Sequence, residues 1–202
     1  DAWTRVKAGD RVLVNGKEIK ARNIQKAYIM LNKPVGVVST CSDEYAEIKV
    51  TDIVKIKGAR LFPVGRLDKD SEGLIFLTDD GDFANRITHP RYEISKTYTV
   101  WVDRKIPEDS IKMLLRGIRD DGETIKAEKI ISKAEKLYIF IMKEGKKREI
   151  RRLVTRAGAN IRKLRRTAVG DVELDKRLPV GKWRHLSEKE VKSLLNNAAE
   201  KR

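Results

Sequence analysis

The most informative stretch of the chain runs Gly65-Arg-Leu-Asp-Lys-Asp-Ser-Glu-Gly-Leu-Ile-Phe-Leu-Thr-Asp-Asp-Gly81. Its first half is a polar turn that follows a proline and a glycine and contains Asp68. The apolar run at residues 74–78 is typical of a buried strand. The aspartates after this strand can cap a helix, which we expect over residues 83–88. The stretch therefore predicts a carboxylate-bearing turn, a core strand and a capped helix in succession.

Predicted strands and helices alternate irregularly on either side of this stretch. Apolar, β-branched and aromatic runs predict strands at residues 28–31, 35–39, 96–102, 125–131 and 137–142. Helical spacing and capping residues predict helices at residues 50–54, 108–116 and 148–157, and a last helix after Ser187. The run at 137–142 is apolar on both faces, which predicts a central strand. Since no βαβ rhythm occurs, we expect a mixed α+β fold.

The beginning of the chain predicts a hairpin over residues 6–19. Asn15-Gly16 supplies the positive backbone angles that a two-residue turn between alternating strands requires. So short a segment cannot bury a core of its own. We therefore expect residues 1–26 to be the end of a larger N-terminal module with its linker, and residues 27–202 to form the main domain.

The composition indicates a folded protein that binds a polyanion. The 202 residues include 45 Lys and Arg against 30 Asp and Glu, a formal net charge of +15, and 40% are hydrophobic. A chain this apolar can form a core, and the positive excess points to RNA, DNA or an anionic membrane. The single cysteine, Cys41, excludes an intrachain disulfide and a cysteine-built zinc site. Since the apolar runs are too short to cross a bilayer and no signal segment is visible, we expect a cytoplasmic protein.

The charge is distributed unevenly along the chain. Residues 143–166 contain eleven basic and two acidic residues, whereas residues 68–82 contain six acidic residues and one lysine. In the basic helix the apolar residues must face inward, which leaves Arg148, Arg152 and Arg156 in a row that can follow a phosphate backbone. Two alternatives stay open. The helix could serve only solubility, or lie on a membrane, although it lacks the bulky aromatic residues that membranes favour.

Asp68 is unexpected in such a protein, because a carboxylate repels phosphate. To stay ionised and oriented it needs a cationic partner, which the arginine-rich helix can supply. The spacing equally allows Asp68 to cap a turn. Two further interpretations are weak. A calcium loop would need flanking helices and a bidentate glutamate at its twelfth position, and Asp68 with Asp70 lacks the separation of a glycosidase pair.

Several motifs resemble those of the bacterial ribosomal small- and large-subunit pseudouridine synthases. The stretch that begins at Gly65 resembles the signature of this family. The resemblance continues through Leu31-Asn-Lys-Pro-Val-Gly36, Thr88-His-Pro90, Lys96-Thr-Tyr98, Glu144-Gly-Lys-Lys-Arg-Glu-Ile-Arg-Arg152 and Leu178-Pro-Val-Gly-Lys-Trp183. These motifs occur in order over residues 27–186. Residues 1–26 resemble the end of the S-four type (αL) RNA-binding domain that precedes the catalytic domain in this family.

The resemblance implies a pseudouridine synthase fold, in which helices flank a bent, mostly antiparallel mixed sheet. It implies site-specific isomerisation of a uridine in ribosomal RNA. The N-glycosidic bond is broken, the uracil turns, and the base rejoins the ribose through C5. The resemblance implies no metal or other cofactor, and a monomer that binds a ribosomal RNA stem-loop, naked or in an assembling subunit. The loop at residues 39–43 and the basic profile favour large-subunit over small-subunit RNA.

The resemblance also implies roles for individual residues. Asp68 matches the catalytic aspartate, which either attacks C1′ or takes a proton from C2′. Arg66 matches the arginine that props the RNA open after the uridine has flipped out. Tyr98 matches the tyrosine that stacks on the uracil, Ile150 the apolar floor, and Arg151 the arginine paired with the aspartate.

The basic stretch supplies the remaining RNA contacts that we expect, which are Lys146, Lys147, Arg148, Arg152 and Arg156. Within this stretch the sequence departs from the family pattern at one position. Glu149 stands where a glutamine is common, and it adds a negative charge near the expected cleft.

One alternative function belongs to a different class. A non-catalytic RNA-binding or ribosome-assembly protein on the same scaffold would explain the net charge and the arginine row equally well. It would not explain why Asp68, Tyr98 and Arg151 are all present, because a relative without activity should have lost at least one of them.

Overall fold

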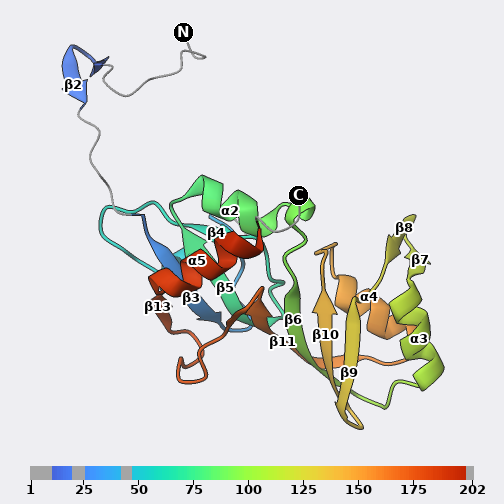
Figure 1. Cartoon of the computed structure of the whole chain (residues 1–202). Coiled ribbons are helices and arrows are strands. Elements are labelled where there is room, and N and C mark those ends of the chain that lie inside the picture. The colour runs from blue at the N-terminus through green and yellow to red at the C-terminus, as the bar shows by residue number, and fades with distance from the viewer. Residues whose placement is uncertain (1–10, 20–25, 42–46, 199–202) are drawn as a thin grey trace.

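The computed structural model describes residues 11–19, 26–41 and 47–198. One large sheet runs through the main body (Figure 1) and contains β3 (Tyr28–Lys33), β4 (Phe62–Val64), β5 (Glu72–Thr78), β6 (Lys96–Val102), β9 (Lys129–Ala134), β10 (Leu137–Met142), β11 (Ile161–Val169), β12 (Val172–Glu173) and β13 (Trp183–His185). Its strand order is β13-β3-β5-β11-β6-β10-β9, with β4 beside β5 and β12 beside β11. Only β5 and β11 pair in parallel within this sheet, so the predicted mixed, mostly antiparallel arrangement is confirmed.

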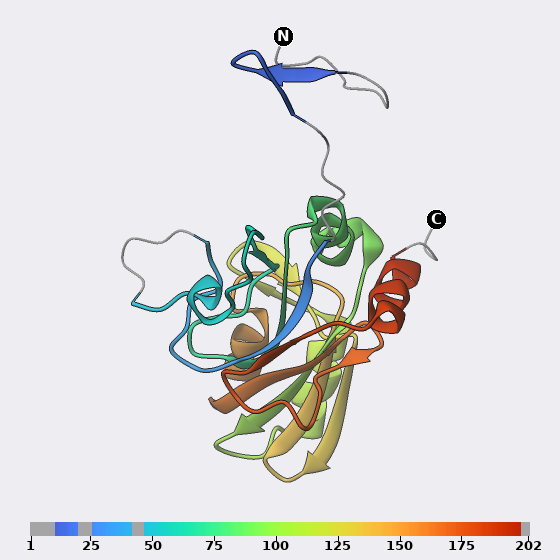
Figure 2. The same ribbon diagram turned by 90° about the vertical axis from the view of Figure 1, so that its left-hand side faces the viewer.

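The helices of the described residues are α1 (Val50–Ile53), α2 (Gly81–Thr88), α3 (Glu108–Arg116), α4 (Glu149–Arg156), α5 (Glu188–Asn197) and a 3-10 turn at Pro90–Tyr92. As Figures 1 and 2 show, α2 and α5 lie by the half of the sheet that contains β3 and β5, whereas α3 and α4 lie by the half that contains β9 and β10. Over the described ranges, none of these helices combines the length and apolarity that crossing a membrane requires.

Three apolar cores hold the helices on the sheet. The first joins α3 and α4 to β6, β10 and β11. The second joins α2 and α5 to one face of β3 and β5, and the third joins α1 to the opposite face of these two strands. β5 is buried at all seven of its positions, as expected for the apolar run that follows the Asp68 turn. The Asp68 loop is therefore followed directly by a fully buried strand.

Two short hairpins lie outside the large sheet. β1 (Val12–Val14) pairs with β2 (Lys17–Ile19), and β7 (Ile118–Asp120) pairs with β8 (Glu123–Ile125). The first pair confirms the predicted hairpin over residues 11–19, while its residues 6–10 lie outside the described residues. The division into a module at 1–26 and a domain at 27–202 stays a prediction.

The strand predicted at residues 35–39 is wrong. Gly36 adopts a left-handed φ of +91° and its amide donates to the Lys69 carbonyl at 2.8 Å, while Val38 forms only an isolated bridge to Lys49. This segment does not extend the sheet, because its backbone hydrogen bonds go to the loop that carries Asp68 and to residues 48–50 at the start of α1.

The strands predicted at 125–131 and 137–142 also differ in part. The first divides into the end of β8 and the start of β9, because Ala127 donates its amide to the Leu114 carbonyl at the end of α3. The second is β10, which has neighbours on both sides, but its residues alternate between buried and half-buried. The helices therefore cover only one face of β10.

Gly73 of β5 pairs with Arg166 of β11, and the two backbones lie close together at this position. Its φ is +105°, and a Cβ atom built on it would lie 2.3 Å from the Arg166 carbonyl oxygen. We expect Gly73→Ala to lower the free energy of unfolding by about 3 kcal/mol, through the combined clash and backbone strain. Urea denaturation monitored by circular dichroism measures this loss.

Gly122 provides the matched control, because its φ of +78° is similarly restricted but no atom lies within 4 Å of the position of a Cβ. Gly122→Ala should cost only the conformational penalty of about 1–2 kcal/mol. Equal losses in the two variants would contradict the proposed close contact between β5 and β11.

Candidate active site

Asp68 lies in the loop between β4 and β5, and this loop is fixed by hydrogen bonds at its base. The Ser71 amide donates to the Asp68 carbonyl at 3.0 Å. The Ser39 hydroxyl donates to the Leu67 carbonyl at 2.8 Å and accepts from the Leu67 amide at 3.2 Å. Asp68 is itself half-buried. The loop therefore presents its carboxylate from a backbone held on both sides.

Lys33 lies behind this loop at the end of β3 and is fully buried. Its ammonium donates to the carbonyls of Ser71 at 2.8 Å and Pro34 at 2.9 Å. Burial, together with the positive charge of Arg166, lowers the pKa of Lys33 to about 8. Lys33 was not among the site residues expected from the sequence. A lysine at the end of a mostly apolar strand was the signal that could have identified it.

Arg166 of β11 is a second buried cation that was not among the site residues expected from the sequence. It is 5% exposed, and its guanidinium donates to the carbonyls of Leu74 at 2.7 Å and Arg66 at 3.2 Å. These two carbonyls flank the Asp68 loop. Arg166 therefore connects the loop to the strand that joins the two halves of the sheet.

A cavity of about 320 Å³ opens beside Asp68, and we call it the Asp68 cleft. Its size falls within the range of small-ligand pockets in proteins. Eight of the residues expected at the site line it, namely Arg66, Asp68, Tyr98, Lys146, Lys147, Arg148, Ile150 and Arg151. The structure thus brings together residues from a loop, a strand and a helix that are far apart in the sequence.

Two apolar surfaces line the Asp68 cleft from different elements. Tyr98 comes from β6 and is half-buried, and Ile150 comes from the first turn of α4 and is 6% exposed. Both pack against the core beneath α4, which fixes their positions. A planar base that enters the cleft can therefore contact an aromatic ring and an aliphatic side chain.

Arg151 contacts the neighbours of Asp68 and not the Asp68 carboxylate expected as its partner. Its Nη2 donates to the Asp70 carbonyl at 3.0 Å and the Ser71 hydroxyl at 3.2 Å, and lies 3.2 Å from Asp70 Oδ1. Arg148 pairs with the same Asp70 carboxylate at 3.2 Å. The half-buried Arg151 thus holds the Asp68 loop against α4, and Arg148 adds a more exposed ion pair to the same carboxylate.

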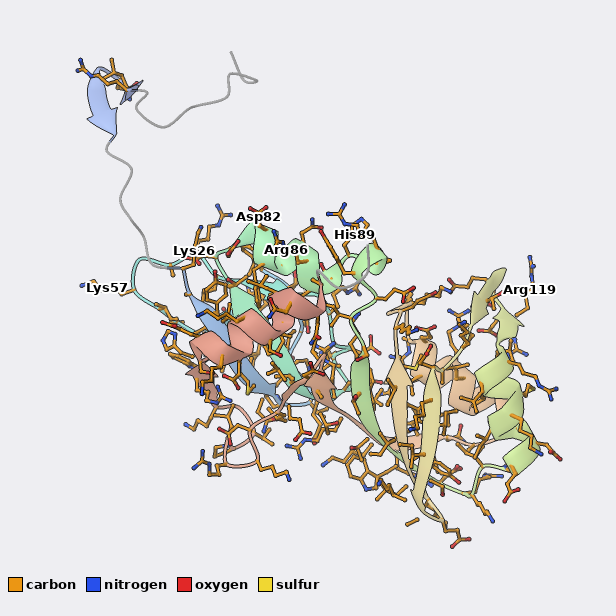
Figure 3. All side chains as sticks on the ribbon, in the orientation of Figure 1. Lys26, Lys57, Asp82, Arg86, His89 and Arg119 are labelled. Atoms are coloured by element: carbon orange, nitrogen blue, oxygen red, sulfur yellow. The ribbon has the colours of Figure 1, made fainter. Side chains whose placement is uncertain are left out.

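Of the three arginines expected in an exposed row along α4, Arg148 and Arg156 are exposed and Arg152 is half-buried, and all three pair with carboxylates. Arg152 pairs with Asp120 and Glu123 of the β7–β8 hairpin, and Arg156 Nε donates to Asp120 at 2.7 Å. Hydrogen bonds from Arg152 and Arg156 lower the pKa of Asp120 below its usual value. Arg119, the preceding residue of β7, points to the outside (Figure 3). The role of Arg152 and Arg156 as RNA contacts stays a prediction, and to contact a phosphate either side chain would have to share or leave its carboxylate partner on the hairpin.

We expect Arg152→Met to lower the melting temperature by several degrees, because it leaves the buried Asp120 without its main partner. The activity of the folded variant should stay close to that of the unchanged chain. Thermal unfolding together with a single-turnover assay checks both statements. Arg162→Met is the matched control, since Arg162 is exposed on β11. An unchanged melting temperature in Arg152→Met would contradict this role.

Glu149, the residue that departs from the family pattern, is 5% exposed. Its Oε2 accepts a hydrogen bond from the Lys146 amide at 3.2 Å, and burial raises its pKa above the usual value. Lys147 and Arg148 next to it are exposed at the rim of the cleft. Glu149 therefore secures the loop that carries the rim cations.

The family model described as RNA pseudouridylate synthase matches residues 27–156, a range that contains the whole Asp68 cleft except Leu164. The chain belongs to the RNA pseudouridylate synthase family. The resemblance inferred from the sequence motifs is thereby confirmed, and so is the class of enzyme that it implied.

Individual relatives in this family agree with the assignment. The chain is 39% identical to the dual-specificity RNA pseudouridine synthase RluF of Escherichia coli, over 93% of this chain and 64% of that protein. It is 38% identical to the ribosomal large subunit pseudouridine synthase B of Bacillus subtilis, over 94% of this chain and 79% of that protein. A crystal structure of a pseudouridylate synthase superposes with a TM-score of 0.78 at 28% identity, over 95% of this chain and 83% of that one. The predicted fold is therefore confirmed.

Proposed function

We propose that this chain converts one specific uridine of ribosomal RNA into pseudouridine, and that the large-subunit RNA is its substrate. The observation that carries the proposal is the Asp68 cleft, in which the residues matched to family roles line one cavity. The Bacillus subtilis relative, which is named for the ribosomal large subunit, supports the choice of RNA.

The target uridine must leave its stack to reach Asp68, because the glycosidic carbon is inaccessible inside a helix. In this proposal the uracil enters between Tyr98 and Ile150, where stacking contributes about 1–3 kcal/mol. Arg66 is exposed at the rim, so its planar guanidinium can occupy the gap that the flipped base leaves in the RNA.

Asp68 is the proposed catalytic carboxylate, and it acts on the ribose. Attack on C1′ and removal of a proton from C2′ both require an ionised carboxylate that is held in place. The N1–C1′ bond then breaks, the uracil turns, and a C5–C1′ bond forms. The proton on C5 is lost and N1 gains one, so the product is an isomer of the substrate. Tyr98, which lines the cleft, is the proposed group that moves the proton at C5.

The RNA around the target is proposed to dock on the basic rim of the cleft as a stem-loop. Arg66, Lys147 and Arg148 are exposed there and can contact phosphates, with Lys146 beside them. In this proposal the chain acts as a monomer. A ribosomal RNA substrate, naked or within an assembling subunit, makes the cytoplasm the proposed compartment.

A carbodiimide primer-extension map of both ribosomal RNAs tests this proposal. The RNAs, naked or in assembling subunits, come from cells that lack this protein and are incubated with the unchanged chain or with Asp68→Asn. We expect one new stop in the large-subunit RNA, with the unchanged chain only. A stop only in the small-subunit RNA would overturn the choice of substrate, and no stop in any sample would overturn the activity.

A further inference from the structure

A second cavity, of about 410 Å³, adjoins the Asp68 cleft. The two cavities share lining residues from the Asp68 loop, from β6 and from the rim loop, namely Arg66, Tyr98, Glu144, Gly145 and Lys146. A chain-like ligand that fills the Asp68 cleft can therefore continue directly into the second cavity past a common wall.

The floor of the second cavity is apolar. Val64 of β4, Phe76 of β5, Ile87 of α2 and Val169 of β11 line it, and each is at most 5% exposed. β5 and β11 pair with each other at only two positions, and these do not include Phe76 and Val169. An apolar floor with a few polar groups around it suits the face of a planar base.

Lys96 brings a positive charge to this cavity. It lies on β6 two residues before Tyr98, and Arg166 is paired with Tyr98 across the β6–β11 ladder. Burial, reinforced by the charge of Arg166, lowers the pKa of Lys96 to about 8. Among the residues that the structure describes, no hydrogen bond or ion pair reaches the Lys96 ammonium. Glu149 acts on this ammonium only through its charge and without a hydrogen bond, so an anionic group in the cavity would supply the direct partner that Lys96 lacks.

Two other cations at the second cavity already have carboxylate partners. Lys143 pairs with Glu128 at 3.1 Å, and Lys146 pairs with Glu144. Arg166 is engaged by two carbonyls, as described above. An apolar floor with an ammonium beside it fits a nucleotide, whose planar base can lie on the floor while its phosphate contacts the ammonium. A free anion would contact the ammonium but not the floor.

We propose that the second cavity binds an unpaired nucleotide of the substrate RNA close to the target uridine. Its base lies against the floor of Val64, Phe76, Ile87 and Val169, and its phosphate contacts Lys96. This inference rests on the proposed function, and it adds a selection rule to it. A second base must leave its stack together with the target, so the enzyme selects a bulge or loop over a continuous helix.

Synthetic RNA hairpins that carry the mapped target site test this subsite. One set has an abasic residue at each of the two positions on either side of the target, and a second set has a neutral methylphosphonate at each flanking phosphate. The hairpins are assayed for kcat/KM with the unchanged chain, Lys96→Met and Lys96→Arg. Lys133→Met is the control, because Lys133 is exposed on β9.

We expect one abasic position to lower kcat/KM of the unchanged chain by about tenfold, as the loss of one stacked base should. A methylphosphonate at the same nucleotide should also lower kcat/KM for the unchanged chain, for Lys133→Met and for Lys96→Arg. In Lys96→Met it should have little further effect, because the charge contact is already lost.

Two outcomes would overturn the subsite while leaving the proposed function intact. In the first, every abasic hairpin reacts at the rate of the unmodified one. In the second, Lys96→Met, shown to be folded by circular dichroism, is as sensitive to each methylphosphonate as the unchanged chain. Failure of the unchanged chain to isomerise any hairpin would overturn the proposed function, and the subsite with it.

Discussion

We expect Asp68→Asn to abolish uridine isomerisation while the chain still binds its RNA. The amide keeps the shape of the carboxyl group but can neither attack C1′ nor take a proton from C2′. The loss should be at least about 10³-fold in the single-turnover rate, which corresponds to about 4 kcal/mol of transition-state free energy. RNA affinity should be retained or increased, because a negative charge has left a cleft that faces phosphates.

Single-turnover kinetics and filter binding on the same hairpin measure these two effects separately. Asp82→Asn is the matched control, since Asp82 lies on α2 at the outer surface of the molecule (Figure 3) and should react at the rate of the unchanged chain. Substantial turnover by Asp68→Asn would remove Asp68 from the catalytic role.

We expect Arg151→Met to lower kcat by about 100-fold and to change KM for RNA much less. Arg151 contacts the Asp70 carbonyl and the Ser71 hydroxyl, on the loop that presents Asp68. Its loss allows the loop to shift, and a displacement of about 1 Å at a reacting group can cost about 10²-fold in rate. Arg151 is therefore a positioning residue in the free enzyme, and steady-state kinetics on a hairpin substrate measures its effect.

Arg148 provides the comparison, because it pairs with the same Asp70 carboxylate but is exposed at the rim. Arg148→Met should raise KM and reduce the salt dependence of binding while kcat changes little. If Arg151→Met raised KM and left kcat unchanged, Arg151 would be an RNA contact and not a positioning residue.

The local elements were predictable because the interactions that form them lie within a few residues. Asp80 accepts hydrogen bonds from the amides of Asp82 and Phe83 and so begins α2, and Ser187 and Glu190 form the capping box of α5. The apolar spacing of α4 fixed which of its faces is buried, and therefore the position of Ile150. Periodicity and caps are properties of the sequence itself.

β11 could not be predicted by the same means. Five of the first seven side chains of β11 are basic or polar, in the sequence Ile161-Arg-Lys-Leu-Arg-Arg-Thr-Ala-Val169. The alternation of apolar and polar residues that is typical of a strand is therefore not apparent. The strand is stable because it lies between β5 and β6, where Arg166 finds carbonyl acceptors in a buried position. Those acceptors are about 100 residues away in the sequence, so no local pattern indicates them.

For the candidate site, the sequence by itself determined the family motifs, the turn that carries Asp68 and the strand that carries Tyr98. Only the tertiary structure decided how the charged side chains are paired. Arg151 and Arg152 are adjacent in the sequence, yet one holds the Asp68 loop and the other is neutralised by Asp120. Helix geometry places neighbouring residues on different faces of α4. Which carboxylate each arginine then contacts depends on the long-range packing of the β4–β5 loop and the β7–β8 hairpin against this helix.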